Sequence, residues 1–595
     1  MNKDVKAIGD EEVPGLSAAR PVVFGNLPGL FTAAAGEPRN VAVLFLSPWG
    51  LEEFLTRKFY RHLAERFAKV GIASLRFDFP GTANAADAPE GDGIERFAEA
   101  VRLAADQLKE LSGVSRIVVL GQGLGGGLAY QYAATADDLA GLALLAPVFK
   151  GRGYLRELKL WSKFVDDGLG LKPEDRDSAP GTIAGIDMAE RLAADLKGFD
   201  ASGPGLPLPL PVLLANKPGI PADPVVLEKL GAAGCQVTVS AYRDFDTLLT
   251  GVSPPELPLS FAEEVVEWLT GLPAWQKPAS LASTLPETGQ VFGDTWRETP
   301  LRFGKHNRLI GTLCEPTGPS NGVTAVILST SYDCQVGWGR SSVLLARRLA
   351  GKGVTSLRYD GADIGDSPPV PGRRPQVLYT EEQADDAEVA FAALKQRGLA
   401  DNCMVIGRCS GAYAAFRTAL RGPHWKGCVV VNPYGFHWRF IGLPGTLKEY
   451  WARARSPDLS ARLRSGRVHV TAAILNIAVR LLDRTASLVG RFVPRVPGIV
   501  QRNKIVHSQF RKLFGFGTRV TIVYSEGDEA MASFLVHFGK NSEGLAAFPN
   551  ARLHLIPNAD HNLTPRPARE KLFRIIEEEA LALADAGNAA RDVTL

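Results

Sequence analysis

The chain has 595 residues, which is too long for one hydrophobic core and predicts several domains. Hydrophobic residues make up 45% and charged residues 22% of the sequence, as is ordinary for globular proteins. The net charge of +3 favours no class of partner, and six cysteines without regular spacing exclude a disulfide framework and a zinc-finger array.

The N-terminal segment predicts no targeting signal. Met1 to Lys6 runs directly into the acidic residues Asp10, Glu11 and Glu12, without an apolar h-region. No uninterrupted apolar run reaches the length needed to span a membrane. We therefore expect a cytoplasmic protein, and the cysteine pattern fits a reducing compartment.

The sequence contains two copies of one pattern. Residues 41–85 match residues 323–367 at a constant offset of 282, and further along the offset becomes 286. Apolar strand-like runs alternate with helical patterns in each copy, which predicts a mostly parallel sheet with helices on both faces. In chain order, the first copy is expected to contain strand 41–47, helix 57–70, strand 72–77, helix 94–111, strand 116–120, helix 125–135 and strand 142–145.

The repeat divides the chain into two domains and a linker. We predict a first domain over 1–267, a linker over 268–298 and a second domain over 299–595. Each domain carries an insertion before its later strands, at about 148–208 in the first and about 435–518 in the second. These insertions are expected to cap the carboxyl ends of the strands, where open α/β sheets bind ligands.

A glycine-flanked cysteine marks the candidate site. The apolar run Cys403–Ile406 leads into Gly407-Arg408-Cys409-Ser410-Gly411, and a helical pattern of small residues follows. The glycines flank Cys409 at the spacing of a nucleophile elbow, where a strained turn needs small neighbours. A buried structural thiol is the alternative, since free cysteine is often a small core residue.

Both copies resemble the α/β-hydrolase superfamily. The resemblance depends on the elbow, on Arg358-x-Asp360 followed by Gly365-Asp366-Ser367, and on the chain order nucleophile, acid, histidine. More narrowly, both are similar to serine-aminopeptidase-like hydrolases found beside bacterial exosortase and exopolysaccharide gene sets. The residues that carry this similarity are Gly153–Leu158 in the first cap, and Gly407–Ala412 with Val431-Asn432-Pro433 in the second copy.

The resemblance implies two tandem α/β-hydrolase domains and a catalytic triad in the second. The family places its acid and its histidine after two later strands, at Asp528 and His561. His561 would take the proton of Cys409, and Asp528 would hold the imidazole in the correct tautomer. Glu526 or Glu529 could replace Asp528.

The expected acyl-transfer chemistry also needs two N–H donors for an oxyanion. One should be Ser410, directly after the nucleophile, and the other Ser331 or Tyr332, in the loop after Ser329. Ser410 itself is a weaker candidate nucleophile, because the flanking glycines then stand at the wrong offsets.

The first copy lacks these groups. Gly123 stands at the nucleophile position and Thr247 at the histidine position, while Asn216-Lys217-Pro218 offers no clear carboxylate. We interpret this domain as a pseudoenzyme. The G-x-G-x-x-G pattern from Gly121 to Gly126 matches the dinucleotide-binding fingerprint, but its alignment with the second elbow explains it better.

The second cap is strongly basic. Between Arg439 and Arg519 stand 16 Lys and Arg residues against three acids, and residues 468–493 follow a basic amphipathic helical pattern. A solvated cap helix explains this pattern, and so does an anionic partner or an anionic membrane surface. No nucleic-acid-binding module is recognisable.

These features predict a cysteine-nucleophile hydrolase that acts on an ester or thioester through an acyl-enzyme, with transfer to an acceptor equally open. Peptidase activity ranks below esterase or thioesterase activity. The expected substrate is a small-molecule, lipid-bound or carrier-bound acyl group, with anionic character. No cofactor and no metal site are expected, since ligand spacing is absent. The alternative is a non-catalytic binding or assembly protein built from two hydrolase folds.

Overall fold

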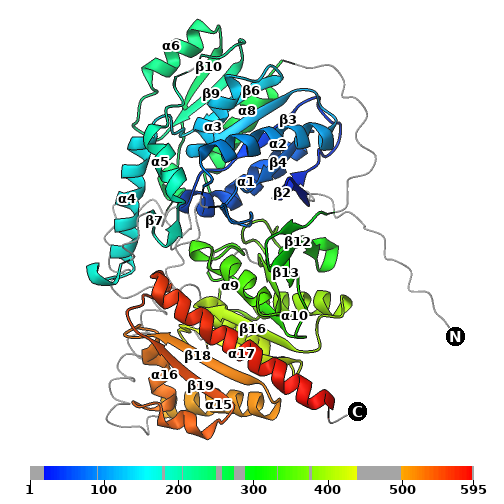
Figure 1. The fold of residues 1–595 in the computed structure, drawn as a ribbon, viewed down its shortest axis with the longest axis vertical. Coiled ribbons are helices and arrows are strands. Elements are labelled where there is room, and N and C mark those ends of the chain that lie inside the picture. Colours follow the sequence, from blue (N-terminus) through cyan, green and yellow to red (C-terminus); the bar gives the residue numbers. More distant parts are fainter. Residues whose placement is uncertain are drawn as a thin grey trace, which may run out of the picture.

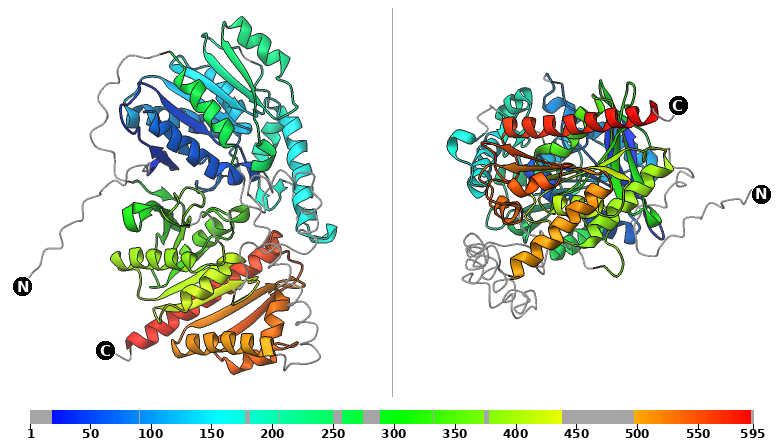
Figure 2. Two further views of the ribbon diagram at one scale, coloured as in Figure 1. Left: turned by 180° about the vertical axis from the view of Figure 1, so that it is seen from behind. Right: turned by 90° about the horizontal axis from the view of Figure 1, so that it is seen from below.

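The computed structural model describes residues 19–89, 91–176, 181–203, 205–249, 257–273, 288–331, 333–373, 378–437 and 497–592. Two halves, each built around one large sheet, stack along the long axis of the molecule (Figures 1 and 2). Among the described helices, none is both long and apolar enough to cross a bilayer.

The first half is centred on an eight-stranded sheet within the described residues, in the order β1-β2-β4-β3-β5-β6-β9-β10. The hairpin of β1 and β2 pairs antiparallel with β4, and the remaining neighbours are parallel. The strands are β1 (Arg20–Phe24), β2 (Leu27–Thr32), β3 (Ala42–Leu46), β4 (Ala73–Phe77), β5 (Ile117–Gln122), β6 (Leu139–Leu145), β9 (Pro211–Asn216) and β10 (Gln236–Ala241).

Helices cover both faces of this sheet, because its central strands are apolar on both sides. One buried cluster lies under α1 and α8, and another under α2, α3 and α6. The cap contributes α4, α5 and the small hairpin of β7 and β8. The bounds are α1 (Leu51–Lys69), α2 (Ile94–Ser112), α3 (Leu124–Ala133), α4 (Gly151–Gly168), β7 (Thr182–Ile183), β8 (Ile186–Asp187), α5 (Glu190–Gly198), α6 (Pro224–Ala232), α7 (Phe245–Leu248) and α8 (Leu259–Thr270).

The second half repeats this strand order with one extra edge strand, β11. The described order is β11-β12-β13-β15-β14-β16-β17-β18-β19, parallel from β15 to β19. The strands are β11 (Val291–Phe292), β12 (Trp296–Phe303), β13 (Leu309–Pro316), β14 (Thr324–Ile327), β15 (Thr355–Tyr359), β16 (Cys403–Arg408), β17 (Trp425–Val431), β18 (Arg519–Ser525) and β19 (Ala551–Ile556).

Helices again cover both faces, with α9 and α17 over one buried cluster and α10, α11, α15 and α16 over the other. In Figure 1 the long helix α17 runs obliquely across the second sheet. The bounds are α9 (Ser341–Ala350), α10 (Glu381–Gln396), α11 (Ser410–Ala419), α15 (Pro497–Gly515), α16 (Met531–Phe538) and α17 (Arg566–Asp592), with short 3-10 turns η1 (Pro173–Asp175), η2 (Lys305–Asn307), η3 (Trp338–Arg340) and η4 (Glu543–Ala547).

The predicted fold class is confirmed, with differences at element boundaries. Helix α1 begins at Leu51, six residues before the predicted start at 57. The predicted linker 268–298 is shorter, because α8 extends to Thr270 and the second sheet already begins with β11 at Val291. The core of the basic cap, residues 438–496, lies outside the described residues.

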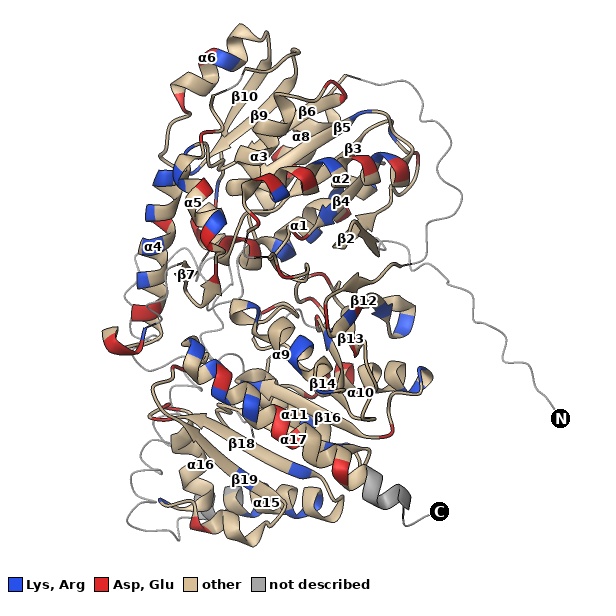
Figure 3. Ribbon diagram, in the orientation of Figure 1, with Lys and Arg blue, Asp and Glu red and all other residues tan. Residues whose placement is uncertain are grey.

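The two halves meet through charged side chains. Segments with residues of both signs face each other between the two sheets (Figure 3). The cap hairpin of the first half also contacts α17, where Arg569 Nη1 donates to the carbonyl of Gly185 at 3.0 Å and Arg566 pairs with Asp187 at 2.8 Å. The first half therefore packs directly against the second.

Replacing Gly407 with alanine should destabilise the second half. An added Cβ would lie 2.0 Å from the carbonyl oxygen of Gly411, which is backbone and cannot rotate away. We expect a loss of about 3 kcal/mol or more in the free energy of unfolding, measured by thermal or urea denaturation. Gly231→Ala is the matched control, because nothing lies within 4 Å of its added Cβ. Equal stability of the two variants would contradict this description of the elbow.

Candidate active site

Cys409 lies at a sharp turn between β16 and α11. Its backbone is left-handed, with φ 54° and ψ −117°, and it is the N-cap residue of α11. An added Cβ at Gly411 would lie 2.7 Å from the carbonyl oxygen of Ser329. The Cys409 N–H donates to Val431 O at 2.8 Å, which ties the strained turn to the neighbouring strand β17. As a residue Cys409 is partly exposed, unlike the fully buried Cys403 at the start of β16.

His561 and Asp528 lie together after the last two strands. His561 Nδ1 is 2.7 Å from Asp528 Oδ2, and the Asp528 side chain is only 5% exposed. Glu526 and Glu529, the alternative acids, are exposed to solvent. Asp528 is therefore the carboxylate that orients this imidazole.

Asn432 supports the histidine and was not predicted from the sequence. Its Nδ2 donates to the carbonyl of His561 at 2.9 Å, and its Oδ1 accepts from Ser525 N at 2.7 Å. The side chain is fully buried, directly after β17. Asn432 therefore links the loops after β18 and β19, which carry the acid and the histidine.

The thiol and the imidazole are electrostatically coupled. His561 Nε2 is buried and has no partner with hydrogen-bond geometry among the described residues. Burial alone would lower the pKa of His561, but Asp528 and the nearby Cys409 raise it to about 9. Burial alone would raise the pKa of Cys409, but His561, Arg408 and Tyr379 lower it below the ordinary thiol value. Both shifts favour a thiolate–imidazolium pair.

Tyr379 is a second neighbour of the thiol that the sequence did not reveal. Its hydroxyl lies 3.7 Å from Cys409 Sγ, within hydrogen-bond range for sulfur. The residue is buried, has a left-handed φ of 59°, and packs against the ring of Tyr413. Its N–H donates to Gln383 Oε1 at 3.1 Å, which holds this unusual backbone in place. No motif places a residue of the β15–α10 connection beside the elbow.

The predicted oxyanion donors lie against each other. We define the oxyanion loop as residues 329–331 and 333–337, after β14. The N–H of Ser331 donates to Ser410 Oγ at 2.7 Å, so its acceptor here is the buried hydroxyl of Ser410. The Ser410 N–H belongs to the first turn of α11, where amides have no intrahelical partner. Tyr332 lies outside the described residues.

The first half has the same turn without the chemistry. Gly123 has φ 56° and ψ −123°, almost the backbone of Cys409. A Cβ there would lie 2.9 Å from Glu52 Oε2, so a carboxylate occupies the space of the nucleophile. Gln122 Nε2 donates to Glu52 Oε1 at 2.8 Å, and burial raises the pKa of Glu52 to about 7. At the histidine position, the Thr247 hydroxyl donates to the carbonyl of Asp244.

The described residues contain no group of three or more His, Cys, Asp or Glu side chains that could hold a metal ion. The site brings together a thiol, an imidazole and a carboxylate, which is the arrangement of a nucleophile, a base and an orienting acid.

One family model matches part of the chain. Residues 50–172 match the model described as serine aminopeptidase, S33, and this segment lies within the half that has Gly123 at its elbow. A search of curated proteins finds no significant match.

A search of solved structures finds similar chains at low identity. A carboxyl esterase from Bacillus coagulans is 14% identical, covering 43% of this chain and 98% of its own, with a TM-score of 0.30. A proline iminopeptidase from Mycobacterium smegmatis is 19% identical, covering 42% of this chain and 98% of its own, with a TM-score of 0.27. A putative hydrolase from Agrobacterium vitis is 18% identical, covering 42% of this chain and 98% of its own, with a TM-score of 0.29. At these identities and TM-scores they add no argument about function.

The coupled thiol should react with iodoacetamide at a pH where ordinary thiols are protonated. The pKa of Cys409 is lowered and that of His561 is raised to about 9, so the thiolate–imidazolium pair is favoured below the pH at which an ordinary thiol ionises. At pH 6.5 we expect the parent to be alkylated at Cys409 at least ~10-fold faster than His561→Ala, because this variant loses the contact that lowers the pKa of Cys409 while burial still raises it. Mass spectrometry of the modified peptide measures this rate, and identical pH profiles would contradict the coupling.

Removing the hydroxyl of Tyr379 should raise the pKa of Cys409 less than removing the imidazole of His561 does. The Tyr379 contact lowers the pKa of Cys409, so Tyr379→Phe should slow alkylation at pH 6.5 by about two- to fivefold. Tyr413→Phe is the control, because the Tyr413 ring packs against Tyr379, while the hydroxyl near the sulfur is that of Tyr379. A Tyr379→Phe rate equal to that of the control would remove Tyr379 from the site.

Proposed function

We propose that this protein, an α/β-hydrolase, cleaves an ester or thioester with Cys409 as nucleophile in its second half. The observation that carries the proposal is the joint geometry of the elbow and the His561–Asp528 pair at 2.7 Å. A buried structural cysteine would have its pKa raised by burial, as happens for Cys403 and Cys428. The pKa of Cys409 is lowered instead, which favours the thiolate that nucleophilic catalysis needs.

The chemistry follows from the positions of the three side chains. His561 Nε2 takes the proton of the thiol, and the thiolate attacks the acyl carbon to form a tetrahedral oxyanion. Asp528 stabilises the imidazolium through Nδ1–H, and the first-turn amide of Ser410 faces the developing charge. Collapse of the intermediate breaks the bond to the leaving group, which takes the proton from His561. The thioester acyl-enzyme is then attacked by water, or by an acceptor hydroxyl, that His561 deprotonates. The C–S bond breaks as the second tetrahedral intermediate collapses, which releases the acyl product and leaves the Cys409 thiolate beside the protonated His561.

The first half contributes no nucleophile under this proposal. With Gly123 at the elbow and Glu52 filling the adjacent space, its strand ends provide no group that can form an acyl-enzyme. The 16 basic residues between Arg439 and Arg519 favour an acyl substrate that carries negative charge, or contact with an anionic membrane surface. The anionic substrate and the membrane contact are both inferred from the sequence alone.

Cys409→Ala should abolish turnover of aryl esters and acyl thioesters. We expect a loss of at least ~1000-fold in kcat/KM, since the acyl-enzyme can no longer form. Cys235→Ala is the matched control, because Cys235 is also a partly exposed free thiol but lies in the first half. Equal turnover by Cys409→Ala and the parent would reject the proposal in favour of a non-catalytic binding protein.

A further inference from the structure

The junction between the halves brings equivalent segments of the repeat together. Arg76 and Arg358 are equivalent at the offset of 282, as are Asn84 and Asp366. Arg76 of the first half pairs with Asp366 of the second, and Arg358 Nη2 donates to Asn84 Oδ1 at 3.4 Å. The loop after β4 therefore meets the loop after β15 across an approximate two-fold relation.

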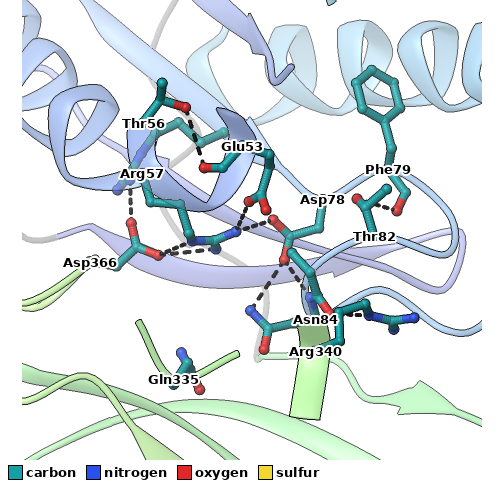
Figure 4. Close-up of polar contacts among 12 residues, drawn as sticks. Glu53, Thr56, Arg57, Asp78, Phe79, Thr82, Asn84, Gln335, Arg340 and Asp366 are labelled. Atoms are coloured by element: carbon teal, nitrogen blue, oxygen red, sulfur yellow. Dashed lines mark hydrogen bonds and ion pairs between the residues drawn. The ribbon is translucent and has the colours of Figure 1, made fainter. Parts of the chain in front are cut away.

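Asp366 is the carboxylate on which the first half converges. Arg57 of α1 donates to Asp366 Oδ2 through Nη2 at 3.1 Å and through Nε at 3.3 Å (Figure 4). Arg76 donates to the other oxygen, Oδ1. The Asp366 side chain is 1% exposed. Burial alone would raise the pKa of this carboxyl, but Arg76 and Arg57 lower it below its ordinary value. An ionised, buried Asp366 thus depends on two cations from the other half.

Asp366 is connected to the oxyanion loop through one further carboxylate. The N–H of Asp366 donates to Asp360 Oδ2 at 2.8 Å, and the N–H of Gln335 donates to Asp360 Oδ1 at 2.6 Å. Asp360 is fully buried. A single carboxylate therefore joins the loop held by the first half to the oxyanion loop.

The oxyanion loop in turn contacts both neighbours of the nucleophile. Thr330 Oγ1 donates to the carbonyl of Arg408 at 2.9 Å, and Asp333 pairs with the Arg408 guanidinium at 3.3 Å. Ser331 N–H donates to Ser410 Oγ at 2.7 Å. The oxyanion loop is therefore held against Arg408 and Ser410 on either side of Cys409, and it is held by Asp360 at Gln335.

The reverse connection is present only in part among the described residues. Arg358 of the second half donates to Asn84, and the N–H of Asn84 donates to Asp78 Oδ2, the equivalent of the Asp366–Asp360 contact. The other oxygen of Asp78, however, accepts from the Arg57 side chain instead of from a loop N–H. The equivalent of Gln335 is Glu53, whose side chain also binds Arg57. The chain of contacts therefore leads from the first half to the candidate active site of the second.

We propose that Arg57 of the first half is a positioning residue for the oxyanion loop of the second half, acting through Asp366, Asp360 and the N–H of Gln335. This inference rests on the proposed function, since it assigns the degenerate half a role in that reaction. Arg57 touches neither substrate nor thiol. Its effect is to hold the oxyanion loop, through the contact between Ser331 N–H and Ser410 Oγ, against the first turn of α11, where charge develops in the transition state.

Steady-state kinetics of the full-length protein test the proposal. Arg57→Met should lower kcat for an aryl ester at least ~10-fold with little change in KM, because oxyanion stabilisation acts in the transition state. The rate at which iodoacetamide alkylates Cys409 should not change, since alkylation forms no oxyanion. Arg57→Lys, which keeps the charge, should recover part of kcat. Arg66→Met is the matched control, because Arg66 lies on the same helix but pairs with Glu263 of the first half.

A second variant covers the case in which Arg57→Met does not fold. Asp366→Asn keeps the shape and the backbone N–H, reproduces the asparagine of the first copy, and should also lower kcat selectively. If Arg57→Met and Asp366→Asn fold and keep the kcat of the parent, the proposal is wrong. It is also wrong if kcat and the alkylation rate of Cys409 fall by the same factor in these variants. These results are separable from the proposed function, which fails only if Cys409→Ala retains turnover.

Discussion

The left-handed backbone of Cys409 is the constraint on which the second half depends. A non-glycine residue at φ 54° is strained by about 1–2 kcal/mol, and it persists because the surrounding structure holds it. Glycine at 407 and 411 lets the turn pass against its own helix and against the end of β14, since a side chain at either position would collide with backbone. The turn therefore presents its side chain at the carboxyl edge of the sheet, where the later loops also end.

The first half separates this backbone geometry from the chemistry. Gly123 adopts nearly the same φ and ψ, but glycine does so without strain and contributes no side chain. Glu52 fills the vacated space and is held by Gln122, whose Oε1 accepts from the Tyr242 hydroxyl at 3.1 Å. The elbow is thus present in both halves, while the second half adds a thiol beside the His561–Asp528 pair.

Buried charge links the two halves. Arg57 contacts carboxylates of both halves, Asp78 at 2.7 Å and Asp366 at 3.1 Å, and all three side chains are largely buried. Removing either half would leave a buried charge without its counterion, so the junction is costly to break. It holds the half with Gly123 at its elbow against the half with Cys409.

The sequence by itself determined the fold class, the duplicated pattern, the elbow around Cys409 and the positions of Asp528 and His561. These features have local signatures, because strand and helix periodicities and glycine spacing act over a few residues. Only the tertiary structure decided that Tyr379 approaches the thiol, that Asn432 supports His561, that Ser331 donates to Ser410, and that Arg57 contacts Asp366. The partners in these pairs are between 30 and 309 residues apart in the chain, so their contact depends on how the strands are ordered and how the halves pack.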